Sequence, residues 1–248
     1  MRVIARLDVK NEYVIKGIHL EGLRKVGDPN ELALKYYEEG IDELLFMDAV
    51  ASLYDRNNLF SIIDKACNDI FVPLTLGGGI RTIADIDNAL KAGADKVAIN
   101  TAAIKTPELI EKASQIYGKQ CIVGSIEAKR KNGFWEAYID NGREPTGKNV
   151  IEWAQRLEKL GAGEIIVTSI DQEGTKKGFD LELIQEVEKA VKCPIVVSGG
   201  YGDSNHLGSL LKETVPSGVA IASVLHYEIS NVSAIKLAVK EYGVEIRP

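Results

Sequence analysis

The feature that most constrains this chain is a regular alternation of short apolar runs with segments of helical periodicity. Eight such runs occur along the 248 residues, and each is continuously apolar and rich in β-branched residues rather than alternating with polar ones. Continuous runs of this kind are typical of parallel strands buried on both faces. They cover residues 2–9, 43–50, 71–79, 96–100, 120–128, 164–171, 193–200 and 218–223.

Helical periodicity occupies the intervals between the runs. The expected helices are Asn30–Glu39, Leu59–Asn68, Ile83–Lys91, Pro107–Tyr117, Val150–Leu160, Leu181–Val191, Leu207–Lys212 and about Val232–Tyr242. Thr82 followed by Asp85, and Pro107 after Thr106, are signals for helix starts. Strand–helix alternation repeated eight times predicts one α/β domain over residues 1–248, a closed (βα)8 TIM barrel. An open, doubly wound sheet is the rival architecture.

The chain also repeats itself at long period. Four positions at the ends of apolar runs recur in the second half of the chain. The pairs are Asp8 and Glu127, 119 residues apart, Asp48 and Asp171 (123), Gly78 and Gly199 (121), and Thr101 and Ser223 (122). A period this long is far above that of a solenoid repeat. The repeat therefore predicts two similar half-barrels, about residues 1–119 and 120–248.

Composition excludes several classes of protein. Hydrophobic residues make up 45% and charged residues 27% of the chain, which indicates a folded globular protein. The net charge of −6 disfavours nucleic acid as a partner, and no apolar run approaches the ~18 residues that span a bilayer. We therefore expect no nucleic-acid partner, no membrane and a cytoplasmic location.

The cysteines and histidines show no metal-ligand spacing, so we expect no metal and no cofactor. The cysteines are interpreted as buried thiols and the histidines as surface or loop residues; these are Cys67, Cys121, Cys193, His19, His206 and His226.

Two carboxylates of the repeat end the first and fifth apolar runs. In a barrel, Asp8 and Glu127 are then expected on opposite walls of the mouth formed by the carboxyl ends of the strands. A facing pair suits general acid–base catalysis, with one group donating a proton and the other accepting it. The alternative is that each only accepts backbone N–H groups from its following loop. Asp48 and Asp171 form a second pair, which we expect to play a supporting role.

Two glycine clusters predict anion sites. Gly78–Gly79 and Gly199–Gly200 allow backbone N–H groups to approach a phosphate, although turns use glycine as well. About 22 residues after each cluster, Asn100–Thr101 and Ala222–Ser223 end the next run and add polar donors. Two such sites across one mouth predict a phosphorylated small-molecule ligand with a phosphate at each end.

Charges also stand at the starts of four runs, at Arg2, Glu43, Lys96 and Glu164. We expect them to form a ring of ion pairs across the amino-terminal opening of the barrel, unless they are simply solvated. After the first run, residues 14–29 form an expected loop with Lys16, which is positioned to close over an anionic substrate.

The combined motifs resemble a known family over essentially the whole chain. LGGGIR, ADKVAINTAA, GREPTG, LGAGEI and SIDQEGTKKGFDLELI are similar to HisF, the cyclase subunit of imidazole glycerol phosphate synthase. The resemblance implies a (βα)8 barrel that forms a heterodimer with a HisH-type glutaminase subunit and takes ammonia from it. It implies conversion of a phosphoribulosyl-formimino aminoimidazole carboxamide ribotide to imidazole glycerol phosphate and the aminoimidazole carboxamide ribotide.

The resemblance also assigns roles to residues. Asp8 matches the first catalytic aspartate, Lys16 the loop lysine, and Asp95 an acidic residue that faces the glutaminase. The phosphate loops match Gly79, Asn100, Thr101, Gly174, Gly200 and Ser223. The family's gate for ammonia matches Arg2, Glu43, Lys96 and Glu164.

Four positions depart from the family pattern. Glu127 and Glu173 stand where aspartate is usual, Arg6 where a cysteine is usual, and Tyr201 where a small residue is usual. Glutamate at position 127 is longer by one methylene, which moves the carboxylate by ~1.5 Å. These changes leave an alternative open, a HisF-like subunit that conducts ammonia to an amidotransferase of bacterial surface sugars. The isomerase sister family lacks the GREPTG and KGFDLEL matches.

Overall fold

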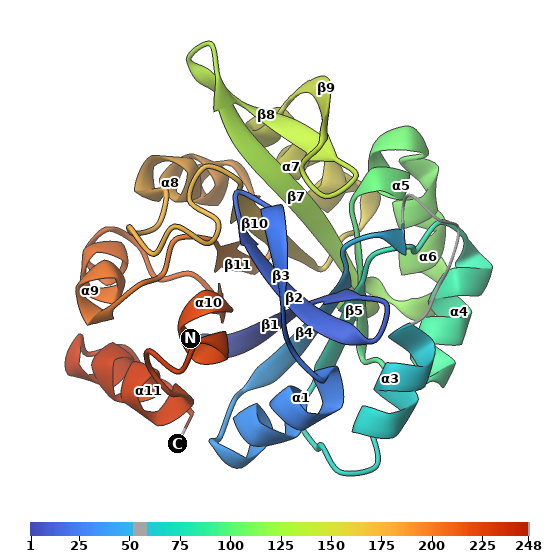
Figure 1. Ribbon diagram of the computed structural model, residues 1–248. Helices are drawn as coiled ribbons and strands as arrows, with labels where there is room; N and C mark the ends of the chain where they lie inside the picture. The colour runs from blue at the N-terminus through green and yellow to red at the C-terminus, as the bar shows by residue number, and fades with distance from the viewer. Residues whose placement is uncertain (52–58, 248) are drawn as a thin grey trace.

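The computed structural model describes residues 1–51 and 59–247, and within them eight parallel strands close into a barrel (Figure 1). Each strand lies on one of the eight apolar runs, which confirms the predicted (βα)8 architecture. The barrel strands are β1 (Arg2–Lys10), β4 (Glu43–Asp48), β5 (Leu74–Gly77), β6 (Lys96–Ile99), β7 (Ile122–Lys131), β10 (Glu164–Ser169), β11 (Ile195–Ser198) and β12 (Gly218–Ile221). They pair in chain order, and β12 closes on β1 with Arg2 opposite Gly218.

Helices surround the barrel, and most follow the expected ranges to within one or two residues. They are α1 (Pro29–Glu38), α3 (Leu59–Ala66), α4 (Ile83–Lys91), α5 (Thr101–Lys105), α6 (Glu108–Tyr117), α7 (Val150–Leu160), α8 (Leu181–Ala190), α9 (Ser204–Glu213), α10 (Ser223–His226) and α11 (Val232–Glu241). Thr82 and Asp85 form the expected capping box at the start of α4. Helix α9 is longer than the predicted Leu207–Lys212, because Asp203 caps it upstream of the apolar stripe.

Two antiparallel hairpins extend the sheet, one in each half of the chain. Strand β1 continues into β2 (Tyr13–Ile18) and β3 (Glu21–Gly27), and β7 continues into β8 (Phe134–Ile139) and β9 (Glu144–Asn149). Residues 14–29 are therefore mainly a hairpin rather than the expected loop. In Figure 1 the β2–β3 hairpin crosses in front of the barrel, while β7 and β8 project away from it.

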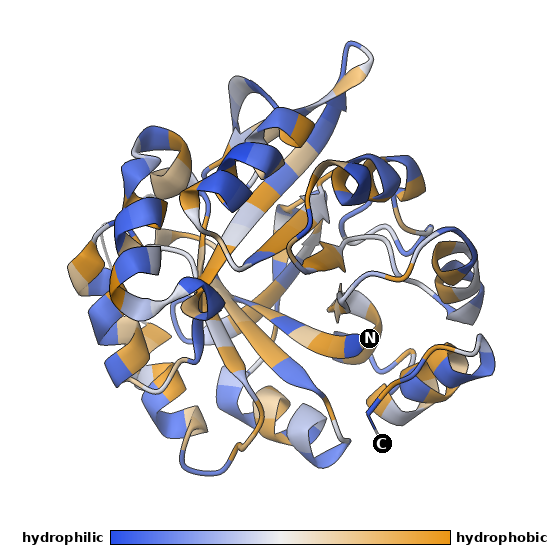
Figure 2. Ribbon diagram, turned by 180° about the vertical axis from the view of Figure 1, so that it is seen from behind, coloured by the Kyte–Doolittle hydropathy of each residue, from blue (hydrophilic) through white to orange (hydrophobic). Residues whose placement is uncertain are grey.

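Two apolar clusters divide the core. The larger lies between strands and helices, and it includes Val3, Ala5 and Leu7 of β1. The smaller lies inside the barrel, where its members are Ile4, Leu45, Ala98, Val123, Ile166, Val196 and Ala220. Successive side chains of a strand point to opposite faces, so the even-numbered residues of β1 face the barrel interior. Figure 2 shows the apolar strands at the centre and polar residues on the outer faces of the helices.

Two minor expectations need correction. The three cysteines are free but only half-buried. His226 is buried rather than exposed, because α10 folds its ring against Tyr36, whose hydroxyl lies 2.8 Å from Nδ1. In the described part of the chain, the helices are too short or too polar to span a membrane.

Candidate active site at the carboxyl ends of the barrel strands

Ion pairs close the amino-terminal end of the barrel interior. Lys96 Nζ lies 2.6 Å from Glu43 Oε1 and 2.8 Å from Glu164 Oε2, while Arg2 Nη1 lies 2.6 Å from Glu43 Oε2 and Nη2 contacts Glu164. Burial opposes the charge on Glu164, but Arg2 and Lys96 lower the pKa of its carboxyl below the usual value. The structure therefore brings together all four charges that the sequence placed at strand starts. We call them the entrance ring.

Above the entrance ring lies the small apolar cluster of the barrel interior, here called the middle layer. Ile4 follows Arg2 on the inner face of β1, and Ile166 follows Glu164 on the inner face of β10. The next inward positions on these strands are Arg6 and Thr168, which begin the polar mouth. The barrel interior is thus charged at the entrance, apolar in the middle and charged again at the mouth.

Asp8 and Glu127 both lie at the mouth and are almost fully buried, with exposed fractions of 6% and 5%. Asp8 Oδ1 accepts a bond from Arg6 Nε at 2.8 Å, and Lys16 Nζ lies 3.4 Å from Oδ2. Burial alone would raise the pKa of Asp8, but the two cations lower it below its usual value. Asp8 is therefore an ionised carboxylate.

The pKa of Glu127 is shifted in the opposite direction, upward. Burial raises the pKa of its carboxyl to about 7, although the backbone N–H of Gly142, which donates to Oε2 at 2.8 Å, and the charge of Arg6 act against this. The negative charges of Asp8 and Asp140 add to the increase. Two carboxyl groups whose proton affinities are driven apart by their surroundings can divide the roles of base and acid.

The first glycine cluster lines a cavity of about 220 Å³ beside Glu127. Gly78, Gly79, Asn100 and Thr101 all line it, together with Lys105. Gly78 has φ +85°, and a Cβ there would lie 2.3 Å from the carbonyl oxygen of Asp48, so only glycine fits this turn. The arrangement presents a glycine backbone, a hydroxyl and a cation to an anion.

The second glycine cluster surrounds a smaller space, of about 10 Å³. Its lining residues include the predicted Gly174, Gly199, Gly200, Ala222 and Ser223. Gly174 and Ser223 also line a wider groove of about 690 Å³, which carries Lys16, Arg24 and Lys176. The two glycine clusters thus border different spaces of the mouth, each with cationic side chains nearby.

The second pair of aspartates supports backbone turns. Asp48 Oδ1 accepts the N–H groups of Val50 and Ala51 at 2.9 and 2.8 Å, and Asp171 Oδ2 accepts that of Arg130 at 2.8 Å. Asp95 is exposed at the start of β6 and accepts the N–H of Leu74 at 2.8 Å. The carboxylates of Asp48 and Asp171 thus bind backbone N–H groups, and their supporting role in catalysis stays a prediction.

Comparisons with known proteins agree with this architecture. A family model described as "Histidine biosynthesis protein" matches residues 2–231. The chain belongs to this histidine-biosynthesis family. A relative from Legionella pneumophila, named imidazole glycerol phosphate synthase subunit HisF, is 58% identical over 203 residues, which cover 82% of this chain and 96% of the relative. A protein of the same name from Bacillus cereus (strain G9842) is 42% identical over 247 residues, which cover 99% and 98% of the two chains.

Two of the positions that depart from the HisF pattern, Glu173 and Tyr201, contact other residues around the mouth. Glu173 contacts Lys16, which brings the β2–β3 hairpin over the mouth, and its backbone carbonyl accepts the N–H of His19 at 2.8 Å. Leu20 at the hairpin turn packs on Tyr138 and Ile170. The longer acid at position 173 therefore reaches the hairpin lysine. Tyr201 packs beside Phe179, at 6.1 Å between ring centroids.

Sequence reasoning noticed Arg6 as a departure from the HisF family but assigned it no contact. The structure places its guanidinium inside the barrel, where Nη1 donates to Thr168 Oγ1 at 2.8 Å and to Ser198 Oγ at 3.2 Å. The alternation of side chains along β1 could have placed Arg6 inside the barrel, because Arg6 shares the inner face of the strand with Arg2 and Ile4. His226 was also missed; its pKa is lowered to about 4 by burial and by Lys16, so the ring is neutral.

Proposed function

We propose that this chain is the ammonia-dependent cyclase subunit of imidazole glycerol phosphate synthase and acts in histidine biosynthesis in the cytoplasm. Its substrate is the formimino ribotide with a phosphate at each end, and its products are imidazole glycerol phosphate and aminoimidazole carboxamide ribotide. The observation that carries this proposal is the buried pair Asp8 and Glu127 at a mouth that also holds two glycine-lined spaces. The HisF name of both relatives supports it.

The chemistry requires an acid and a base. Ammonia must add to a carbonyl carbon, from which water then leaves. The same nitrogen must bond to the formimino carbon and close the imidazole ring, and the bond from that carbon to the ribotide nitrogen must break so that the ribotide departs as an amine. Each leaving group needs a proton, and the incoming nitrogen must lose protons. Asp8, held ionised by Arg6 and Lys16, is suited to accept a proton, whereas Glu127 is suited to donate one.

The ligand spans the mouth. One phosphate binds at Gly79, Asn100 and Thr101, and the other at Gly174 and Ser223. The β2–β3 hairpin closes over the ligand, and Lys16 moves between its acidic partners and the substrate. We also propose that residues 1–119 and 120–248 are equivalent half-barrels of one domain, because each begins with a strand that continues into an antiparallel hairpin.

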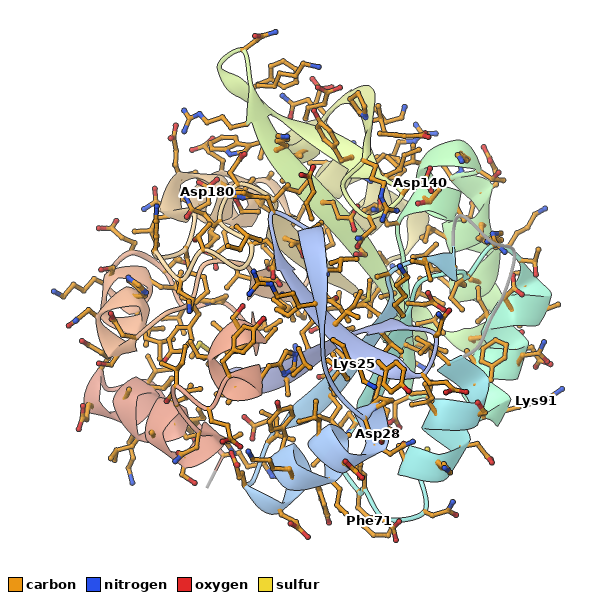
Figure 3. The ribbon with its side chains drawn as sticks, in the orientation of Figure 1. Lys25, Asp28, Phe71, Lys91, Asp140 and Asp180 are labelled. Carbon is orange, nitrogen blue, oxygen red and sulfur yellow. The ribbon has the colours of Figure 1, made fainter. Side chains whose placement is uncertain are left out.

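A HisH-type glutaminase is the proposed partner, and it binds the amino-terminal face of the barrel. Asp95 is exposed on this face, and Phe71, 76% exposed, lies at the periphery of the molecule just before β5 (Figure 3). Ammonia released by the partner enters through the entrance ring of Arg2, Glu43, Lys96 and Glu164 and crosses the middle layer. Being neutral, it does so without the cost of burying a charge.

Turnover of the formimino ribotide with ammonium at high pH tests this function directly. The purified protein is expected to form both products, and Asp8→Asn is expected to lose at least about 100-fold in kcat. Absence of products with the wild-type protein would overturn the proposal. The sugar-amidation alternative receives no support from the relatives, which both carry the HisF name.

A further inference from the structure

Arg6 is a buried cation whose side chain donates hydrogen bonds to Asp8, Thr168 and Ser198 inside the barrel. Its exposed fraction is 2%, and it extends from β1 past the neighbouring strand β12 to reach β10 and β11. Nη1 is held by the hydroxyls of Thr168 and Ser198, at 2.8 and 3.2 Å, while Nε faces Asp8 Oδ1 at 2.8 Å. A guanidinium held in this way has a fixed position, because its planar donor fork is bonded on two sides.

We propose that Arg6 is a positioning residue for the reaction: anchored on Thr168 and Ser198, it keeps the carboxylate of Asp8 ionised and fixed in the mouth. This role rests on the proposed function, in which Asp8 is the base.

Lys16, the second cation near Asp8, cannot keep the Asp8 carboxylate ionised and fixed by itself. Lys16 Nζ is farther from Asp8, at 3.4 Å, and it also pairs with Glu173. It lies on the β2–β3 hairpin, which must open to admit substrate, whereas Arg6 lies on a barrel strand. Whenever the hairpin opens, Arg6 is the cation that stays beside Asp8. A buried carboxylate left without a cation takes up a proton and loses its basicity.

The charged surroundings of Asp8 come from several elements. The groups that act on it or on its partners are Arg6 of β1, Lys16 of β2, Glu127 of β7, Glu173 after β10, and His226 of α10. Among these, only Arg6 and Lys16 are cations, since the His226 ring is neutral near pH 7. Removal of Arg6 therefore leaves the carboxylates in excess.

The test replaces Arg6 by Met, which keeps a long side chain without charge. The carboxyl carbon of Asp8 is followed by ¹³C NMR during a pH titration and assigned by its loss in Asp8→Asn. In the wild type it is expected to titrate below its usual range, and in Arg6→Met to titrate at clearly higher pH. The pair Thr168→Val and Ser198→Ala, which frees the guanidinium but keeps its charge, is expected to give a smaller shift in the same direction.

Steady-state kinetics supply the second readout. The ratio of kcat/KM for Arg6→Met to that of the wild type, both driven by ammonium, is expected to fall about tenfold from pH 8 to pH 5. Taking the ratio cancels the ionisation of ammonia itself. Arg156→Met, the same change on the outer surface, is the matched control and is expected to show a constant ratio near one.

The outcomes separate the two proposals. An unchanged Asp8 titration in Arg6→Met overturns the role of Arg6, whatever the activity. A ratio that is low but independent of pH also overturns it, because a merely structural defect lowers the amount of active protein at every pH. If the titration shifts while the wild-type protein shows no turnover, Arg6 does set the charge of Asp8, and the proposed cyclase function is wrong.

Discussion

The backbone N–H of Gly142 donates a hydrogen bond to Oε2 of Glu127, at 2.8 Å, and this ties the turn between β8 and β9 to the mouth of the barrel. Gly142 has φ +75°, and a Cβ there would lie 2.9 Å from Cδ1 of Leu20 in the β2–β3 hairpin. Both hairpins and the carboxyl group thus meet at one point. A glutamate, one methylene longer than aspartate, spans the distance to this turn.

The raised pKa of Glu127 predicts a stability that depends on pH. Its carboxyl has a pKa of about 7 in the folded chain against the usual 4.5 in the unfolded chain, so between these two pH values mainly the unfolded chain loses this proton. The wild type is therefore expected to lose about 3 kcal/mol relative to Glu127→Gln as pH rises from 4.5 through 7. Urea unfolding of both proteins at pH 4.5 and 8 measures this, and a constant difference would contradict it.

Glu127→Asp is expected to lower kcat for the formimino ribotide by about 10- to 100-fold, because the shorter acid withdraws the proton donor by ~1.5 Å. The bond to Gly142 is lost with it. Ammonium-dependent turnover provides the measurement, and the circular dichroism spectrum checks the fold. A substantial gain in rate from aspartate would show that this mouth has moved away from the reaction.

Lys96 bridges Glu43 and Glu164 in the entrance ring, so Lys96→Ala leaves two buried carboxylates with fewer cations. We expect glutamine-dependent turnover, measured with the glutaminase present, to fall at least tenfold more than turnover driven by ammonium. Ammonium turnover in the same preparation is the internal control. An equal loss in both assays would indicate damage to the fold instead.

Glu173→Gln is expected to release the β2–β3 hairpin, since Lys16 loses a buried ionic partner. Hydrogen exchange of backbone amides in residues 13–27 should accelerate about tenfold or more, and kcat/KM should fall. Lys25→Gln is the matched variant, because Lys25 lies on the exposed side of the same hairpin over Tyr13 (Figure 3). Lys25→Gln should leave the exchange unchanged. Similar acceleration in both variants would show that the contact between Glu173 and Lys16 does not hold the hairpin over the mouth.

Crystals grown with sulfate are expected to hold one anion near Gly79 and Thr101 and another near Gly174 and Ser223. In Gly200→Ala the second anion should be lost while the first remains, because the new Cβ would meet the carbonyl oxygen of Gly178 at 1.9 Å. Gly147→Ala is the control, since Gly147 also has positive φ but no atom within 4 Å of its Cβ position. Sulfate at only one site in the wild type would refute the bisphosphate interpretation.

The barrel strands were predictable because burial on both faces makes each of them a continuous apolar run. The hairpins were not: residues 13–27 mix glycine with charged side chains, and their pairing depends on docking over the mouth. Residue types and the repeat suggested Asp8, Glu127 and the glycine clusters. The contact of Arg6 with Thr168 and Ser198 joins residues more than 160 positions apart, which only the closed barrel brings together.

The middle layer has a consequence for the order of proton transfers. Its apolar side chains separate the entrance ring from the mouth by about 13 Å along β1. An ammonium ion crossing it would have to leave its hydration behind, at a cost far above that of neutral ammonia. Under the proposed function, the middle layer would therefore admit ammonia and exclude ammonium, so that the nitrogen loses its fourth proton before it enters the barrel interior and reaches the mouth as a nucleophile. Asp8 and Glu127 would then transfer only the protons that the proposed reaction itself releases and takes up.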